Sequence, residues 1–427
     1  MKSVYIHIPF CRKICSYCDF CKFFYDKKWI NNYLNCLENE IKETYKNEEI
    51  YTLYIGGGTP SSLSIDELKI LFDIIKVFNT NNLKEFTIEC NVEDITDEKL
   101  KLLKENNVNR LSIGIQTFNK KILKEINREY NVDINEKINL AKKYFDNINV
   151  DLMYAFFDQS IDDLKEDLNK FISLNINHIS CYSLIIEKNT KFYDKKEIDE
   201  ELDYEMYKLV EKTLEKEGFI HYEVSNYAKK GFESKHNLVY WSNEEYYGFG
   251  LSSSSYINDE RITNTKNLSA YLKGINKKEI EKLSTLDKMK YEMILGLRKL
   301  CGVNKKEFYN KYNKDIYEVF DIKNLINSNK LIDDGNNIFI NKDYIYVSNE
   351  ILINFIWNSI INIVGGSMDN IVSMDSLIAE EEVNNENVIK DKKIERIQIG
   401  LIIVLIVVGT LVYFFGYDYL KPFIRVD

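Results

Sequence analysis

The stretch YIHIPFCRKICSYCDFC, residues 5–21, decides how this chain is interpreted. A short apolar run leads into three cysteines, Cys11, Cys15 and Cys18, at C-x3-C-x2-C spacing, with the aromatic Tyr17 directly before the third. A loop of this length can place three thiolates around one face of a [4Fe–4S] cube and leave the fourth iron without a protein ligand. An iron with an open position can bind and activate a small molecule. The spacing therefore predicts a cluster loop with a small-molecule site beside it.

Zinc binding and chance clustering are the two alternatives to an iron–sulfur cluster at these cysteines. Zinc prefers four ligands, often in paired C-x2-C units, and no second pair follows downstream. Cys21 is either a fourth ligand or a spare thiol near the cluster, and we favour the spare thiol. The cluster loop remains the main interpretation.

The composition fits a globular protein of a reducing compartment. The 427 residues predict about two to three domains, and 45% of them are hydrophobic and 29% charged. A net charge of −10 gives no basic field that would attract nucleic acid. Four of the eight cysteines crowd into residues 11–21, which is no disulfide framework, and no signal peptide is visible. We therefore expect a cytoplasmic protein without a nucleic-acid partner.

Short apolar runs alternate with longer amphipathic segments up to about residue 230. Such a series is typical of βα units and a parallel sheet, and it predicts a full or partial (β/α) barrel. The ligand site of such a barrel lies at the C-terminal ends of its strands. The predicted strands are Ser3–Ile8, Thr52–Ile55, Phe86–Cys90, Arg110–Ile115, Ile148–Tyr154, His178–Leu184 and His221–Val224. The predicted helices include Ser64–Phe78, with a capping box from Ser64 to Glu67, Asp97–Asn106 and Ile161–Leu174.

The pattern changes after the predicted barrel. Residues 285–356 combine helical segments with a short alternating segment, which predicts a helical domain of winged-helix-like shape. No dense basic face accompanies it, so we expect a structural or lid role rather than DNA binding. Residues 357–396 contain Gly365-Gly366 and an acidic run, and they are predicted to form an acidic linker.

Residues 397–417 are predicted to form a single transmembrane helix. The segment Ile397–Phe415 is uncharged and almost wholly apolar, and it is long enough to cross a bilayer. Basic residues crowd its near side, so the positive-inside rule keeps the body of the protein in the cytoplasm, with the membrane as a partner through this helix. The alternative is a small membrane protein joined to the chain by a gene fusion or a sequence error.

The run GGGTP at residues 56–60 directly follows the second predicted strand. Three glycines let the backbone approach a ligand closely and leave N–H groups free to bind its polar atoms. A glycine run by itself often serves only as a turn. Pro9 and Pro60 stiffen the cysteine loop and this loop, and together the two loops predict one shared site.

Six stretches carry a resemblance to a known family. They are YIHIPFC at 5–11, GGGTPS at 56–61, RLSIGIQTF at 110–118, YEVSNYA at 222–228, HNLVYW at 236–241 and GLR at 296–298. Residues 1–356 thereby resemble the oxygen-independent coproporphyrinogen oxidase family of radical S-adenosylmethionine (SAM) proteins, and most of all its HemW branch of haem chaperones. The resemblance implies a radical SAM barrel over residues 1–230.

The resemblance also implies the cofactor ligands. Cys11, Cys15 and Cys18 would hold the [4Fe–4S] cluster. The residues that match the family's SAM site are Tyr5, Tyr17, Gly57, Gly58, Thr59, Glu89, Gln116, Arg128 and Asp151. Without the family, Glu89, Gln116 and Asp151 are each more simply an ordinary polar residue at a strand end.

The motif His236-Asn237-x-x-Tyr240-Trp241 matches the one that marks the chaperone branch, where it is implicated in haem binding. A neutral imidazole is a good axial ligand of haem iron, and tyrosine and tryptophan rings can stack on a porphyrin. The alternative is a core histidine hydrogen-bonded under an aromatic cluster. We favour haem ligation by His236, within a haem-motif connecting region at residues 231–284.

The chain departs from the family at several positions. Ala155 and Phe157 replace a glycine and a proline, and Val92 replaces another proline, all near the expected SAM pocket. Cys18 is followed by Asp19 and Phe20, so the Cys-x-Cys pair of the true oxidases is absent, and the first strand begins without their N-terminal arm. The missing pair and the missing arm favour the chaperone over the decarboxylase, and the lost glycine at position 155 weakens the expectation of a radical reaction.

The sequence therefore predicts a haem chaperone that passes haem to membrane respiratory proteins. The cluster and SAM would serve structure, homodimerisation or gating. The enzyme alternative is oxygen-independent decarboxylation of coproporphyrinogen III to protoporphyrinogen IX, for which we expect no turnover. The third candidate is a scaffold protein with a vestigial cluster.

Overall fold

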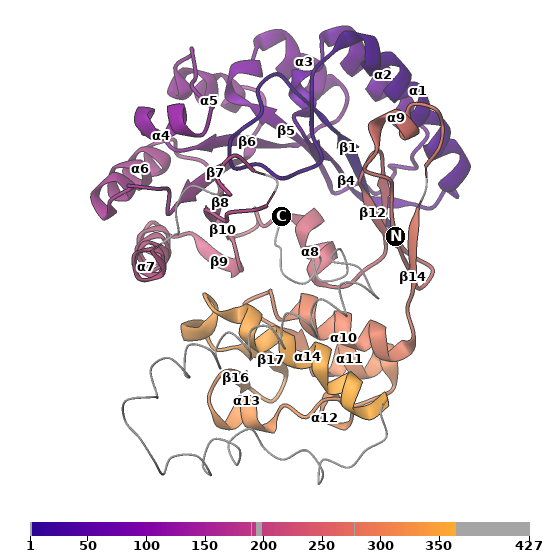
Figure 1. The fold of residues 1–427 in the computed structure, drawn as a ribbon, viewed down its shortest axis with the longest axis vertical. Coiled ribbons are helices and arrows are strands. Elements are labelled where there is room, and N and C mark those ends of the chain that lie inside the picture. Colours follow the sequence, from indigo (N-terminus) through magenta and orange to yellow (C-terminus); the bar gives the residue numbers. More distant parts are fainter. Residues whose placement is uncertain (1, 189, 194–198, 277, 364–427) are drawn as a thin grey trace, which may run out of the picture.

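The computed structural model describes residues 2–188, 190–193, 199–276 and 278–363. Figure 1 shows a large curved sheet with helices along its convex side and a smaller helical unit beneath it. The sheet has 12 strands in the order β14-β13-β12-β11-β1-β4-β5-β6-β7-β8-β10-β9. This order has two ends, so the described chain forms a partial barrel.

The strands from β11 to β8 in this order are parallel neighbours. Each predicted strand of the barrel is confirmed to within three residues. The bounds are β1 (Lys2–Ile8), β4 (Ile50–Gly57), β5 (Glu85–Asn91), β6 (Arg110–Gln116), β7 (Asn147–Tyr154), β8 (His178–Ser183) and β9 (Ile220–Glu223). The other strands of the sheet are β10 (Asn226–Ala228), β11 (Tyr246–Phe249), β12 (Ser254–Ile257), β13 (Glu260–Thr263) and β14 (Glu279–Lys282).

Helices between the strands cover the convex side because each has one apolar face. Side chains alternate along a strand, so Leu111 and Ile113 of β6 join the apolar core while Arg110 and Ser112 face the concave side, called here the barrel interior. The predicted capping box of Ser64 and Glu67 is confirmed. The helices are α1 (Lys27–Thr44), α2 (Ile65–Ile75), α3 (Asp97–Glu105), α4 (Lys120–Glu125), α5 (Ile134–Lys142), α6 (Ile161–Ser173) and α7 (Glu200–Lys216).

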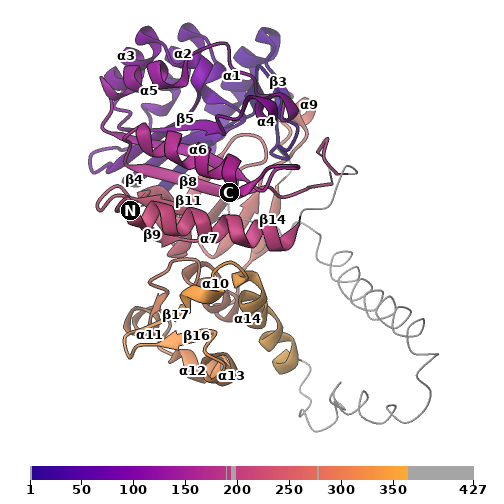
Figure 2. The ribbon, with the colours of Figure 1, turned by 90° about the vertical axis from the view of Figure 1, so that its left-hand side faces the viewer.

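The smaller unit corresponds to the predicted domain at residues 285–356. It combines helices with an antiparallel hairpin of β16 and β17, which follows α13. Figure 2 shows α7 at the boundary between this unit and the barrel. Its elements are α10 (Thr285–Gly296), β15 (Val303–Asn304), α11 (Lys305–Tyr312), α12 (Ile316–Val319), α13 (Lys323–Asn327), β16 (Leu331–Asp333), β17 (Asn337–Ile340) and α14 (Ser348–Ile363).

The prediction of a fold that ends in a transmembrane helix is corrected. Among the helices that the structure describes, none is both long and apolar enough to cross a membrane. The predicted span at residues 397–417 lies outside the described residues, as do residues 364–396 of the predicted linker. The first residues of that linker belong to α14, which continues to Ile363.

The region at residues 231–284 is more than a connection. It supplies β11, which pairs in parallel with β1, and the antiparallel strands β12 to β14. It also contains α8 (Lys235–Trp241) and α9 (Leu268–Tyr271). Figure 1 shows α8 on the concave side, between the sheet and the smaller unit. The segment His236–Trp241 therefore lies against the barrel interior.

Candidate cofactor and haem site

The cysteine loop lies between the short strands β2 (Phe10–Cys11) and β3 (Phe23–Phe24), which pair in parallel. Two side chains donate hydrogen bonds to its sulfurs. Thr59 Oγ1 donates to Cys11 Sγ at 3.4 Å, and Arg128 Nη1 donates to Cys15 Sγ at 3.3 Å. Thr59 and Arg128 were both expected at the SAM site, and the structure brings them to the predicted cluster ligands.

The three thiols are free and lie close enough to influence one another electrostatically. Burial raises the pKa of Cys11 and raises that of Cys18 to about 12, and a neighbouring Cys15 thiolate raises both further. Lys22 acts in the opposite direction on both sulfurs. Deprotonated thiolates would thus need a positive partner, which an iron–sulfur cluster supplies.

This donor set fits a cluster better than a single ion. In the part of the chain that the structure covers, no three histidine, cysteine or acidic side chains surround one metal position. A cubane contacts each thiolate through a different iron, so its ligands need not converge on one point. Cys21 is separate, because its sulfur lies 3.9 Å from Lys266 O and its charged neighbours are lysines rather than the other thiols.

The glycine loop continues β4 and packs tightly on both sides. Gly57 has φ of +111°, and a side chain there would collide with the His7 imidazole. Its N–H donates to Glu89 Oε2 at 2.9 Å, and Tyr54 OH donates to Glu89 Oε1 at 2.8 Å. Gly58 fits against the backbone of Pro9. Glu89 therefore holds the glycine loop through one carboxylate.

Arg128 connects the cysteine loop with the strands β5 and β6. Besides Cys15, its guanidinium donates to Asn91 Oδ1 at 2.6 Å and to Gly114 O at 3.0 Å. A pocket lies beside these groups, lined by Arg12, Lys13, Cys15, Asn91, Glu93, Asp94, Arg128, Glu129 and Tyr130. Gln116 ends β6 with φ of +67°, and its buried Oε1 has no hydrogen-bond partner among the residues that the structure describes. A buried acceptor of this kind fits a donor on a small ligand.

The remaining residues expected around SAM are Tyr5 on β1, Asp151 on β7 and Tyr17 in the cysteine loop. Tyr5 OH is 2.9 Å from His7 Nδ1, and His7 Nε2 is 2.9 Å from Cys21 O, which ties β1 to the cysteine loop. Asp151 accepts from Asn149 Nδ2 at 2.8 Å, and burial raises its pKa. Burial also raises the pKa of Tyr17, whose charged neighbours are Cys15, Arg128 and Cys18.

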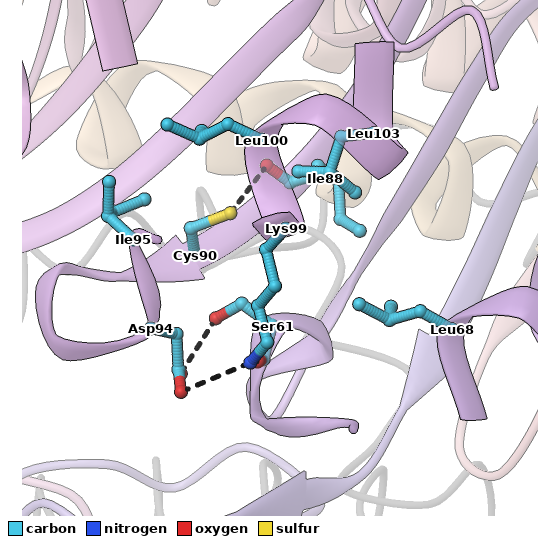
Figure 3. A pocket seen from close by; sticks show the side chains of 9 residues that line it. All are labelled: Ser61, Leu68, Ile88, Cys90, Asp94, Ile95, Lys99, Leu100 and Leu103. Atoms are coloured by element: carbon cyan, nitrogen blue, oxygen red, sulfur yellow. Dashed lines mark hydrogen bonds and ion pairs between the residues drawn. The ribbon is translucent and has the colours of Figure 1, made fainter. Parts of the chain in front are cut away.

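Asp94 is a site residue that the sequence did not indicate. Figure 3 shows its carboxylate turned toward Ser61 and Lys99 at the edge of a mostly apolar cavity. Ser61 Oγ donates to Asp94 Oδ2 at 2.9 Å, Lys99 Nζ lies 3.5 Å from Oδ1, and Arg12 Nε lies 3.8 Å from Oδ1. One carboxylate thus joins the cysteine loop, the segment after the glycine loop, and α3.

His236 lies inside the molecule, and both of its ring nitrogens have partners. Nδ1 is 2.7 Å from Thr52 Oγ1, and Nε2 is 2.7 Å from Tyr240 OH. The ring stacks on Tyr54, with centroids 5.0 Å apart and planes at 29°. Burial, with a smaller effect of Arg110, lowers the pKa of His236 to about 3, so its imidazole is neutral. The geometry is that of a core histidine with a neutral ring, both of whose nitrogens have hydrogen-bond partners.

The other residues of this motif, Asn237, Tyr240 and Trp241, contact different parts of the molecule. Tyr240 packs edge-on against Tyr246, with centroids 4.5 Å apart. Trp241 is buried with its Nε1 unpaired, and the Arg298 guanidinium lies 5.8 Å from its ring. Asn237 takes part through its backbone N–H, which donates to Ser234 Oγ at 3.3 Å. Tyr240 therefore lies beside the histidine, whereas Trp241 contacts Arg298.

Glu85 positions α8, although no sequence pattern marked it. Its carboxylate accepts from Lys235 N at 2.9 Å and from His236 N at 3.0 Å. Glu85 opens β5, so α8 is held at the N-terminal end of the sheet, while Gly57 and Glu89 lie toward the opposite end. Thr52, Tyr54 and Glu85 were missed because only the folded barrel brings them to the motif.

Comparison with known proteins agrees with this geometry. The model of the Radical SAM superfamily matches residues 5–171. The heme chaperone HemW of Bacillus subtilis is 41% identical over 338 residues, which cover 75% of this chain and 89% of that protein. HemW of Lactococcus lactis is 38% identical, with 84% of this chain and 98% of that protein covered.

A solved structure shows the same fold. Coproporphyrinogen III oxidase (HemN) from Escherichia coli superposes with a TM-score of 0.73 over 83% of this chain and 89% of its own, at 21% identity. At 21% identity this similarity shows the fold alone. The identity to the HemW relatives above places the chain in the chaperone branch. The chain belongs to the HemW family of haem chaperones, within the radical SAM superfamily.

Proposed function

We propose that this protein binds haem and transfers it to membrane respiratory haem proteins. The observation that carries the proposal is the 41% identity to a heme chaperone across 89% of that relative's length. Haem is the cargo, and His236 is the proposed axial ligand, with Tyr240 and Trp241 against the porphyrin.

The surroundings of His236 support this assignment. Its neutral imidazole has the protonation state that an iron ligand needs. Nε2 is covered by Tyr240, which is only partly buried, so turning that one ring aside would bare the nitrogen. Thr52 would meanwhile keep its contact with Nδ1 and fix the orientation of the ring.

We further propose that Cys11, Cys15 and Cys18 hold a [4Fe–4S] cluster and that SAM binds in the pocket beside Arg128. The cluster would supply an open iron that can ligate SAM. The residues of the chain orient and enclose these groups: Thr59 and Arg128 donate to the sulfurs, and Gln116 offers a buried acceptor. Structure, dimerisation and gating are the roles in which they would serve a chaperone.

Haem titration of the purified protein and of His236→Ala tests the assignment. We expect a Soret band in the wild type that is strongly reduced in the variant. His178→Ala is the matched control, because His178 is also buried with both nitrogens bonded, to Asn149 and Tyr222. Equal haem binding in His236→Ala and the wild type would remove His236 as the ligand.

An anaerobic assay separates the chaperone from the oxidase that shares its fold. The protein is incubated with SAM, a reductant and coproporphyrinogen III, and protoporphyrinogen IX is measured. We expect none, and robust turnover would reverse the assignment.

A further inference from the structure

Tyr54 is the side chain that joins the proposed SAM region to the proposed haem ligand. Its hydroxyl donates to Glu89 Oε1 at 2.8 Å, and its ring stacks on His236 at 5.0 Å. The second oxygen of Glu89 accepts from Gly57 N at 2.9 Å. A single chain of contacts thus runs from the glycine loop through Glu89 and Tyr54 to His236.

The backbone keeps this chain of contacts tight. Thr52 and Tyr54 lie two residues apart on β4, so both point into the barrel interior, and both touch His236. A Cβ atom at Gly56 would lie 2.6 Å from Glu89 Oε1 and 2.7 Å from the Tyr54 ring. The absence of a side chain at Gly56 is therefore what lets Glu89 and Tyr54 meet.

A ligand with a cationic amino group that engages Glu89 would compete with the donors already there. If it displaces Tyr54 OH, the hydroxyl is left inside the barrel without its acceptor, which is unfavourable unless the ring moves. The ring cannot move without disturbing the stacked His236. The two sites would then be linked energetically, and such linkage acts equally in both directions.

We propose that Tyr54 is a positioning residue that couples SAM binding to the release of His236 for haem, so that SAM strengthens haem binding. This inference rests on the proposed function, in which SAM binds beside the cluster and His236 ligates haem, and on Glu89 as one of the residues that match the family's SAM site. Tyr54 acts through its contacts with the Glu89 carboxylate and the His236 ring, which are the groups proposed to meet the ligands. It transmits the state of Glu89 to the imidazole.

The test is haem titration of the full-length, cluster-reconstituted protein with and without SAM, read from the Soret band. We expect SAM to tighten haem binding in the wild type by roughly tenfold. Tyr54→Phe keeps the ring on His236 and removes only the hydroxyl. The ratio of the haem affinities measured with and without SAM should therefore fall to about one, while haem and SAM each still bind. Tyr247→Phe is the control, because Tyr247 OH also donates to a carboxylate, Glu48 Oε1 at 2.7 Å, away from both sites.

A second readout needs no haem. Carbethoxylation of His236 by diethyl pyrocarbonate, followed by mass spectrometry, should be faster with SAM in the wild type and in Tyr247→Phe but not in Tyr54→Phe. The coupling would be overturned if SAM changed neither haem affinity nor carbethoxylation rate in the wild type, or if its effect were the same in Tyr54→Phe as in the wild type. Loss of the proposed function looks different: haem would fail to bind at all, or would bind equally to His236→Ala.

Discussion

Replacing Asp94 by alanine removes a carboxylate that the cysteine loop, the segment after the glycine loop and α3 all share. Asp94 and Lys99 are 9% and 13% exposed, so the variant takes the carboxylate away from a buried ammonium group, which keeps its hydrogen bond to the carbonyl oxygen of Ser61. Breaking such a pair costs about 3 kcal/mol. Arg12 adds little, because it is 57% exposed and exposed pairs contribute less than about 1 kcal/mol. We expect a free energy of unfolding lower by about 3 kcal/mol.

Urea unfolding of the cluster-free protein measures this loss as a shift of the midpoint at constant slope. Asp73→Ala is the matched control, because its ion pair with Lys76 at 2.6 Å is 70% exposed on both sides. That variant should change stability by less than about 0.5 kcal/mol. In a Lys99→Met background the Asp94→Ala substitution should cost at least about 1 kcal/mol less. Equal unfolding midpoints for Asp94→Ala and Asp73→Ala would refute the reasoning.

Two further outcomes are expected. Ala155 has φ of +58°, a left-handed conformation that costs an L-residue about 1–2 kcal/mol. Glycine removes this cost, but its greater freedom in the unfolded chain offsets part of the gain. Ala155→Gly should therefore stabilise the protein by about 0.5–1 kcal/mol, measured by thermal unfolding. His236 has a folded pKa of about 3, below its ordinary 6.5, so its contribution is complete above pH 6.5 and is lost as the pH falls toward 3. Between pH 7 and pH 5 this amounts to about 2 kcal/mol, so the free energy of unfolding of His236→Gln in urea should depend less on pH by that amount than the wild type's. An equal pH dependence in the two proteins would contradict it.

The repeating part of the fold could be predicted from sequence because its signals are local. The strand Arg110–Gln116 and the helix Ile161–Ser173 each carry their own pattern of apolar residues. By contrast, Tyr246–Phe249 is only four residues long, and it becomes a strand by pairing with β1, which is distant in the sequence. A pattern within one segment cannot reveal a partner that lies elsewhere.

The site divides in the same way. The cysteines and the glycine loop are recognisable because spacing and backbone freedom are written into consecutive residues. Asp94, Tyr54 and Glu85 each have a key contact with a residue more than 30 positions away, which no pattern near them in the sequence marks. Ala155 is intermediate, because the departure from glycine was visible but its φ of +58° was not.

Glu85 and Glu89 also constrain how the sheet can assemble. They lie four residues apart on β5, with Thr87 between them, so all three face the barrel interior, while Phe86, Ile88 and Cys90 face the apolar layer beneath the helices. A slip of β5 by one residue against β4 or β6 would turn both carboxylates into that apolar layer and place the apolar side chains in the polar interior. The residues that hold the glycine loop and α8 thereby make the shifted pairing of the strand unfavourable.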